Sequence, residues 1–401
     1  MAEILLCTRF LLIAATNLCL FLVVATWCFI PVYIVELGGS SADAGFVMGS
    51  LGITSLGSLP FLAPLIDRYG RKVFIVGGIL VIGISNAAFL LFDTYSPLMI
   101  LVRLVQGVAF AACFNGCATA VIDIVPEEKR AQGIGLFGVS GSLAVAIGPF
   151  LGEICITKWD FQAYFYLLVG FGLIGFLTAL FVPESTTRKT TREKMQGFFP
   201  TAIRGGYLAM MAVAVIFGSG FAAMNTFFPL FAKSLGIQAG IFFVCYGSAL
   251  FLVRVFLGQI VDRVSKERLI FLCLMGFGLL LVSTSRLESL GQTALLGALF
   301  GIAQGLSYPA MMARMLSRSS AENRAVVVAL FTGSFGVGIN VSVLAWGCMA
   351  DFNGLPFMFL TGGAIMFICA AIYFLSVFAF GVHPSPTGTL IENKGPGAAT
   401  R

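Results

Sequence analysis

Long stretches almost free of charge recur along this whole chain. All but one, residues 269–285, reach the roughly 20 residues that a helix needs to cross a bilayer. Only 10% of the 401 residues are charged, against roughly 25% in soluble domains. The chain is therefore expected to be an all-α integral membrane protein with twelve transmembrane helices, because a helix satisfies its own backbone in lipid. The stretches are 10–34, 44–66, 73–92, 96–122, 131–156, 161–182, 205–232, 234–261, 269–285, 289–313, 325–350 and 352–382.

Basic residues gather in every second connection between these stretches. The alternate connections hold only Lys158, Lys233 and Arg286. Because cytoplasmic loops carry the excess of Lys and Arg, both chain ends are expected to be cytoplasmic. The location is then the plasma or inner membrane, crossed many times. The net charge of +6 becomes a topology signal, and no nucleic-acid partner is expected.

The longest polar connection lies near the middle and divides the chain into two halves. We expect an N-terminal six-helix bundle at 1–182, a cytoplasmic loop at 183–206 and a C-terminal six-helix bundle at 207–382. The tail at 383–401 lacks apolar residues to bury and is expected to be disordered.

The two halves repeat each other. Arg130-Ala131 matches Arg324-Ala325 at a shift of 194 residues, and Gln106-Gly107 matches Gln304-Gly305 at a shift of 198. An internal repeat with an even number of helices per half predicts two parallel, pseudo-symmetric bundles.

The connection after the second stretch resembles a motif of the major facilitator superfamily. The family pattern is G-x-L-x-D-R-x-G-R-R/K, and Ala63 takes the place of its first glycine. The counterpart in the second half keeps Asp262 and Arg263 and has Ser265 in place of a glycine. The motif here reads Ala63-Pro-Leu-Ile-Asp67-Arg68-Tyr-Gly70-Arg71-Lys72.

Two further elements support the same resemblance. Arg103-Leu-Val-Gln106-Gly107 is similar to the R-x-x-Q-G element of the family. Gly148-Pro149-Phe-Leu-Gly152-Glu153 is similar to the G-P-x-x-G-G element of proton-driven efflux members, with Glu153 at the last glycine. The resemblance spans all twelve stretches and implies the major facilitator fold. The most similar members are twelve-helix drug/proton antiporters, that is, efflux permeases.

The motif loops are the expected gates of such a transporter. The gating set comprises Asp67, Arg68, Gly70, Arg71, Lys72, Asp262, Arg263, Arg130 and Arg324. A carboxylate is stabilised at a helix N-terminus, so Asp67 is expected to bind the helix that starts at Arg324, and Asp262 the helix that starts at Arg130. The alternative is a local ion pair, worth about 0 to 1 kcal/mol when exposed.

Charges inside the spans are expected to serve coupling. Arg103 lies about seven residues below the outer end of its stretch, where an unpaired charge is costly. Glu153, at a compatible depth on the next stretch, is its predicted partner, and the pair is our candidate for proton coupling. A purely structural pair is the alternative. Arg254 is expected to extend towards the cytoplasm.

Uncharged polar and aromatic residues near the middle of the spans are the candidate cargo ligands. The family implies that the first, fourth, seventh and tenth helices line the cavity, whereas hydrogen bonding between helices is the alternative reading. With no acid in the first or seventh stretch, neutral, amphipathic or anionic cargo is favoured. The candidates are Asn17, Trp27, Asn115, Asn225, Phe228, Gln304 and Tyr308; Gln106, Gly107, Gly148, Pro149 and Gly152 are assigned to helix packing.

An enzyme is disfavoured, because the chain has one histidine and no nucleophile-and-base or metal-binding arrangement inside its spans. No cofactor and no metal are expected. The sequence predicts a secondary transporter that moves a small solute by rocker-switch alternating access, as proton-coupled efflux. The alternatives are a facilitator or proton-coupled importer of a small metabolite, or a non-transporting receptor. Its expected partners are the solute, protons and the lipid bilayer, and the chain is expected to be a monomer.

Overall fold

The computed structural model describes residues 8–126, 129–184, 201–203, 206–257, 264–320 and 323–379. Every regular element in these ranges is a helix. Eleven helical segments are long and apolar enough to cross a membrane, and a shorter apolar helix, Gly240–Phe256, matches the remaining predicted span. The predicted all-α membrane fold is confirmed.

The first half consists of six spans, two of them broken or ended by a short helical turn. The first span is divided into α2 (Thr8–Thr26), η1 (Trp27–Phe29) and α3 (Ile30–Glu36). The others are α4 (Ser41–Tyr69), α5 (Arg71–Ala87) with η2 (Ala88–Leu91), α6 (Leu98–Ile124), α7 (Arg130–Lys158) and α8 (Phe161–Leu180).

The second half repeats this plan. Its first span is divided into α10 (Leu208–Ala222), η4 (Ala223–Phe227) and α11 (Phe228–Ser234). The others are α12 (Gly240–Leu252) with η5 (Val253–Leu257), α14 (Lys266–Thr284), α15 (Leu290–Leu316), α16 (Arg324–Asn353) and α17 (Leu355–Phe374) with η7 (Leu375–Ala379).

Proline accounts for the break in the first span of each half. Pro31 lies at the start of α3 and Pro229 at the start of α11. A proline cannot donate the backbone hydrogen bond to the preceding turn, so a 3₁₀ turn (η1) and a π turn (η4) precede them. A shift of 198 residues relates the two prolines.

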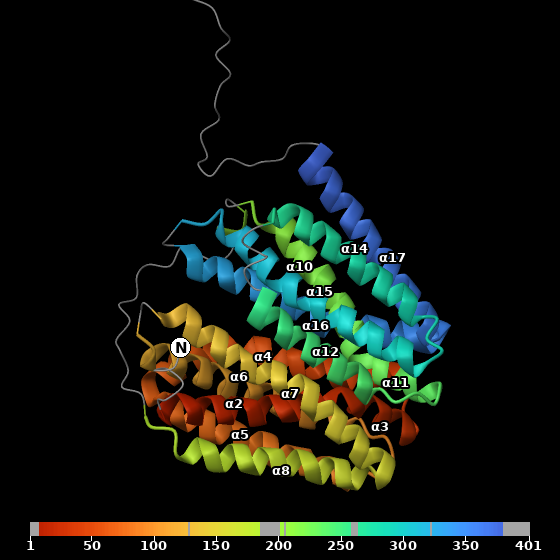
Figure 1. The fold of residues 1–401 in the computed structure, drawn as a ribbon. Coiled ribbons are helices and arrows are strands. Elements are labelled where there is room, and N and C mark those ends of the chain that lie inside the picture. The colour runs from red at the N-terminus through yellow and green to blue at the C-terminus, as the bar shows by residue number, and fades with distance from the viewer. Residues whose placement is uncertain are drawn as a thin grey trace, which may run out of the picture.

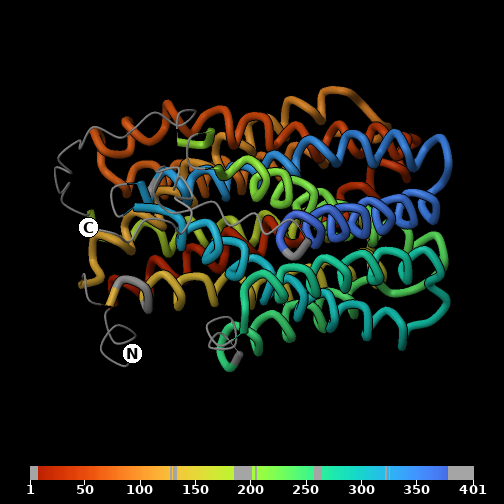
Figure 2. The backbone as a smooth tube through the Cα atoms, turned by 90° about the horizontal axis from the view of Figure 1, so that it is seen from above, coloured from red at the N-terminus to blue at the C-terminus, as the bar shows by residue number. Residues whose placement is uncertain are grey.

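The two halves lie side by side, with the N-terminal helices in red to yellow and the C-terminal helices in green to blue (Figure 1). Seen from above, the helices run along a common direction (Figure 2). Across the boundary, α4 packs against α16 and α7 against α12. We call the end where α4 finishes and α7 and α16 begin the basic face, since it carries Arg68 and Arg324; the other end is the opposite face.

Candidate transport gates and cavity

A carboxylate of the first half holds the start of a helix in the second half. Glu153, near the end of α7, accepts the backbone N–H of Ala239 at 2.6 Å through Oε1 and that of Gly240 at 2.8 Å through Oε2. These amides stand at the N-terminus of α12, where the first N–H groups have no helical partner and the helix dipole favours negative charge. We call this contact the α7–α12 latch.

The same arrangement occurs on the other side of the molecule. Asp351, near the end of α16, accepts the N–H of Ser41 at 2.6 Å and that of Ala42 at 3.0 Å, one on each oxygen. Ser41 and Ala42 begin α4, whose N-cap is Ser40. We call this contact the α16–α4 latch.

The two latches are related by the internal repeat. A single shift of 198 residues takes Ser41 to Ala239, Ala42 to Gly240 and Glu153 to Asp351. Each latch joins the two halves at the opposite face. A third link there is an ion pair between Glu36 and Lys233, beside a pocket of about 610 Å³. The opposite face is therefore closed by polar contacts between the halves.

Glycines let the latched helices touch at backbone distance. A Cβ placed on Gly49 of α4 would lie 2.9 Å from the carbonyl oxygen of Asn340, and one on Gly247 of α12 would lie 2.5 Å from Ala146. A side chain at either position would force the helices apart. The shift of 198 residues also relates these two glycines, so close packing continues inwards from both latches.

The basic face also has a pocket, where α4 and α6 end. It has a volume of about 420 Å³ and is lined by residues of these helices and by Arg71. Asn115, a predicted cargo ligand, and Thr119 contribute its polar wall, while Leu59 and Leu62 contribute apolar wall. This pocket is the described cavity nearest to the predicted gating loop.

Arg71 organises the predicted gating loop within the first half. It pairs with Asp67 at 3.0 Å and with Asp123 at 3.1 Å, and it is buried. Gly70, at φ +92°, makes the turn between α4 and α5, which few other residues could adopt. The amide of Lys72 faces the Glu184 carboxylate at 3.4 Å.

The remaining predicted gating residues are placed only in part. Arg68 lies over the ring of Tyr69, 5.2 Å from its centre, and Arg324 is exposed at the start of α16. The side chain of Arg130 is not among those described, and Asp262 and Arg263 lie outside the described residues. Asp67 pairs with Arg71 here, and its contact with the start of α16 stays a prediction.

The predicted pair between Arg103 and Glu153 was wrong. The Glu153 carboxylate is turned towards α12, whereas Arg103 donates to Gln106 Oε1 at 2.8 Å and to Met48 Sδ at 3.6 Å. Its guanidinium also lies over the Trp27 ring, 4.4 Å from the ring centre. Equal depth on neighbouring helices did not put the two side chains on facing sides.

Arg254 also departs from its prediction. Instead of extending towards the basic face, it donates to the Gly138 carbonyl at 3.1 Å and to Ser142 Oγ at 2.6 Å. Both partners are on α7, so Arg254 bridges the two halves. The nearby acceptors on α7 satisfy donors that would otherwise require hydration within the span.

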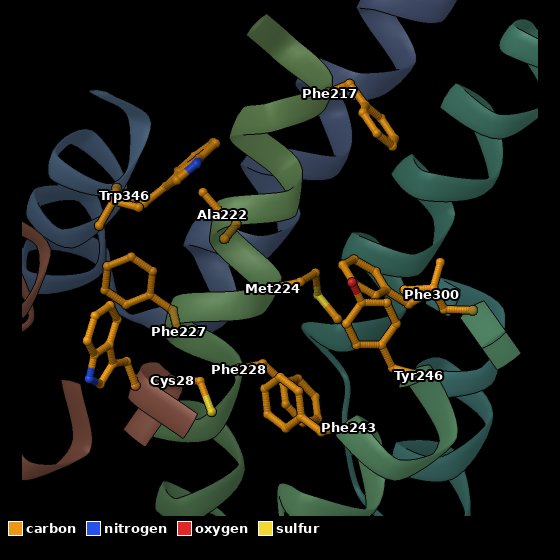
Figure 3. Close-up of a cluster of buried hydrophobic side chains, with 14 of the residues drawn as sticks. Cys28, Phe217, Ala222, Met224, Phe227, Phe228, Phe243, Tyr246, Phe300 and Trp346 are labelled. Carbon is orange, nitrogen blue, oxygen red and sulfur yellow. The ribbon is translucent and has the colours of Figure 1, made fainter. Parts of the chain in front are cut away.

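Two predicted aromatic walls of the cavity are packed in the core in this conformation, and their contact with cargo stays a prediction. Trp27 is buried beneath Arg103 and donates its indole N–H to Asn86 at 2.9 Å. Phe228 is fully buried and stacks on Phe242, with ring centres 4.2 Å apart. Figure 3 shows Phe228 beside Phe243, in the aromatic packing next to the broken part of the seventh span.

The other predicted cargo ligands differ in the contacts that their side chains make. Asn17 donates to Ser140 at 2.7 Å, and Asn115 donates to the carbonyl of its own helix at 2.7 Å. Asn225 is partly exposed within η4. Gln304 is buried, and its Oε1 has no hydrogen-bond partner among the described residues. The ring of Tyr308 lies edge-on to that of Phe331, with ring centres 4.9 Å apart.

The predicted packing residues stand where helices approach closely. A Cβ on Gly107 would lie 2.2 Å from the Leu51 carbonyl oxygen. A Cβ on Gly148 or on Gly152 of α7 would lie 2.6 Å from the Thr26 side chain. Pro149 lies between these two glycines inside the helix. Gln106 is buried and donates to Asn86 at 3.3 Å.

Sequence reasoning missed Asp351, Gly240 and the pair of Glu36 with Lys233. One signal could have found Asp351: it is the repeat partner of Glu153 at the same shift that aligns Gln106 with Gln304. No comparable signal identifies the amides that the carboxylates bind.

The fold and these motifs define a family, and comparison with known proteins agrees. The family model of the Major Facilitator Superfamily matches residues 11–285 and 236–400. The chain belongs to this superfamily. It is a multi-pass membrane protein and a secondary transporter for a small molecule, and it is not an enzyme.

Its similar relatives include an export protein and a multidrug resistance protein. The chain is 24% identical over 371 residues to the staphylopine export protein of Staphylococcus aureus, covering 86% of this chain and 90% of the relative. It is 24% identical over 350 residues to multidrug resistance protein 2 of Bacillus subtilis, covering 84% and 86%.

Similar solved structures include the nucleoside transporter NupG, with a TM-score of 0.76 at 16% identity, covering 91% of this chain and 98% of that one. A bacterial homologue of the lysosomal transporter Spinster, in an inward-facing and occupied conformation, has a TM-score of 0.75 at 15% identity, covering 94% and 96%. Likeness at this level establishes the fold alone.

Proposed function

We propose that this protein exports a small solute in exchange for protons, by alternating access between its two halves. The observation that supports this most is the pair of repeat-related latches, which join the two halves at the opposite face. Such contacts exist only in one orientation of the halves, so they must break for the opposite face to open. The similarity to the staphylopine export protein supports the outward direction.

The basic face is the cytoplasmic face in this proposal, which puts both chain ends in the cytoplasm. The inward-open state is then the one described, and cargo enters between the halves from the cytoplasm. Access of a membrane-impermeant thiol reagent to a cysteine at Gly291, on the opposite face, tests the orientation. Labelling from outside intact cells is expected, and labelling only after lysis would reverse the assignment.

Cargo is received between the halves, at polar residues of the spans that the family uses. The candidates kept from the sequence are Asn17, Asn115, Asn225, Gln304 and Tyr308. Trp27 and Phe228 are packed in the core of the closed opposite face. They would reach cargo only after that face opens.

Glu153 is our candidate for proton coupling, now as a gate rather than as the partner of Arg103. Its latch needs an ionised carboxylate, because a protonated carboxyl loses its charge and one acceptor. Once the opposite face is open, a proton from outside can bind Glu153, and reclosure requires that proton to leave. Export is driven when that proton is passed inwards through the protein before the face closes, because a proton returned to the outside completes no exchange. Arg103, also buried in the first half, is the second candidate for this route.

The proposed coupling predicts a specific pH response. Spin labels at Lys158 and Gln238, in protein whose ten native cysteines are replaced, report the α7–α12 separation. Acidification should lengthen this distance in the parent, since the latch is lost as pH falls. In the Glu153→Gln variant this distance should be long at every pH. Equal pH dependence in both proteins would assign coupling elsewhere.

A further inference from the structure

Arg254 uses only one of its terminal nitrogens within the protein. Nη1 makes both described hydrogen bonds, to Gly138 and Ser142 of α7. A guanidinium has five N–H donors, and the three on Nε and Nη2 form one of its two forked edges. In the part of the chain that the structure describes, no hydrogen bond occupies that edge. The side chain is exposed, so the edge is accessible.

The charge of Arg254 is not balanced by an acid among the described residues. The groups that act on it electrostatically are two neutral phenols, those of Tyr246 and Tyr308. A cation inside a span is costly without a counter-charge or water. The other residues proposed to receive cargo are uncharged, so Arg254 is the cation among them.

A second, independent observation lies on α15, the helix that packs against η5, which holds Arg254. A Cβ on Gly305 would lie 2.7 Å from Val253, so α15 and η5 touch at this level. Gln304, which precedes Gly305, is 8% exposed, and its Oε1 is a buried acceptor without a partner among the described residues. A buried amide oxygen without a donor costs free energy. It points to a hydrogen-bond donor that the protein itself does not supply.

We infer that Arg254 is a specificity residue for cargo that carries a carboxylate and a hydrogen-bond donor. The free forked edge of its guanidinium matches the two oxygens of a carboxylate. Gln304 Oε1 then accepts an O–H or N–H from the same molecule. This inference rests on the proposed function and names its substrate class: small organic anions, not lipophilic cations, which the positive site repels.

The test compares two probes that differ only in charge. These are 6-hydroxy-2-naphthoate and its carboxamide, titrated by calorimetry against the full chain in nanodiscs, with empty nanodiscs as the blank. The parent should bind the carboxylate more tightly. Arg254→Gln should weaken carboxylate binding about tenfold to a hundredfold and leave the carboxamide unchanged. Arg254→Lys should lie between, because lysine keeps the charge without the fork.

A matched control separates ligand binding from bridging the halves. Ser142→Ala removes a partner of Arg254 but leaves its free edge, so the preference for the carboxylate should persist. A loss in Ser142→Ala as large as that in Arg254→Gln would show that Arg254 acts as an interdomain tie, and would overturn the inference. Equal affinity of the parent for both probes would overturn it as well. The spin-label distances that test alternating access need no cargo, so the two proposals fail separately.

Discussion

The two latches of the opposite face use the same chemistry in different surroundings. In each, one carboxylate accepts two successive amides at the start of a helix of the other half. Glu153 is partly buried and its amides belong to buried residues, whereas Asp351 is exposed. A charge–dipole contact is worth about 0.3 to 1 kcal/mol at an exposed site and up to about 2 kcal/mol when partly buried.

Latches related by the internal repeat can therefore differ in the stabilisation that they contribute. Water competes for the Asp351 carboxylate and screens it, while the Glu153 contact is shielded by α7 and α12. We therefore expect the α7–α12 latch to set the balance between the two states and the α16–α4 latch to adjust it.

The largest effect is expected for Glu153→Gln. Loss of the charge should favour opening of the opposite face by about 2 kcal/mol, roughly thirtyfold in population. The labels at Lys158 and Gln238 measure it at neutral pH. An unchanged distance distribution would mean that packing alone holds this side closed.

Gly240→Ala should weaken the same latch without altering any charge. Its new Cβ would lie 2.6 Å from Glu153 Oε2, so the carboxylate must move. We expect a smaller shift, about fivefold, measured with the same labels. Gly291→Ala is the matched control, because a Cβ there meets nothing within 4 Å. An equal shift in both variants would point to a general effect of alanine.

Asp351→Asn should produce a lesser opening, about twofold to fivefold, because the contact is exposed. Labels at Phe46 and Phe352, on α4 and α16, report this side. High salt should reduce the difference between variant and parent. An effect equal to that of Glu153→Gln would contradict the expected difference in strength between the two latches.

Asp67→Asn should have the smallest effect, and of opposite sign. The proposed contact of Asp67 with the start of α16 forms only when the cytoplasmic side closes, so its loss favours the inward-open state. In the Glu153→Gln background it should reverse part of the opening, about twofold. No reversal would leave Asp67 as a local partner of Arg71.

The fold could be predicted because lipid imposes one solution. Apolar stretches of the right length must be helices, and the motifs around Asp67, Arg103 and Gly148 identify the family. The repeat was visible in Gln106 and Gln304, whose shift of 198 residues also relates the two latches.

The contacts of the gates could not be predicted in the same way. Depth along a helix follows from residue number, but the direction of a side chain depends on how helices are rotated against each other. Arg103 and Glu153 have similar depths and face different partners for that reason. The amides of Ala239 and Gly240 are backbone groups, so no residue type marks them as ligands.

In the proposed cycle, the latches close one face while the other is open. The most direct measurement follows both faces in one preparation of Glu153→Gln/Asp351→Asn, with labels at Phe46 and Phe352 for the opposite face and at Tyr69 and Arg324 for the basic face. We predict that the first distance lengthens and the second shortens relative to the parent. Lengthening of both distances, or of neither, would contradict alternating access controlled by these latches.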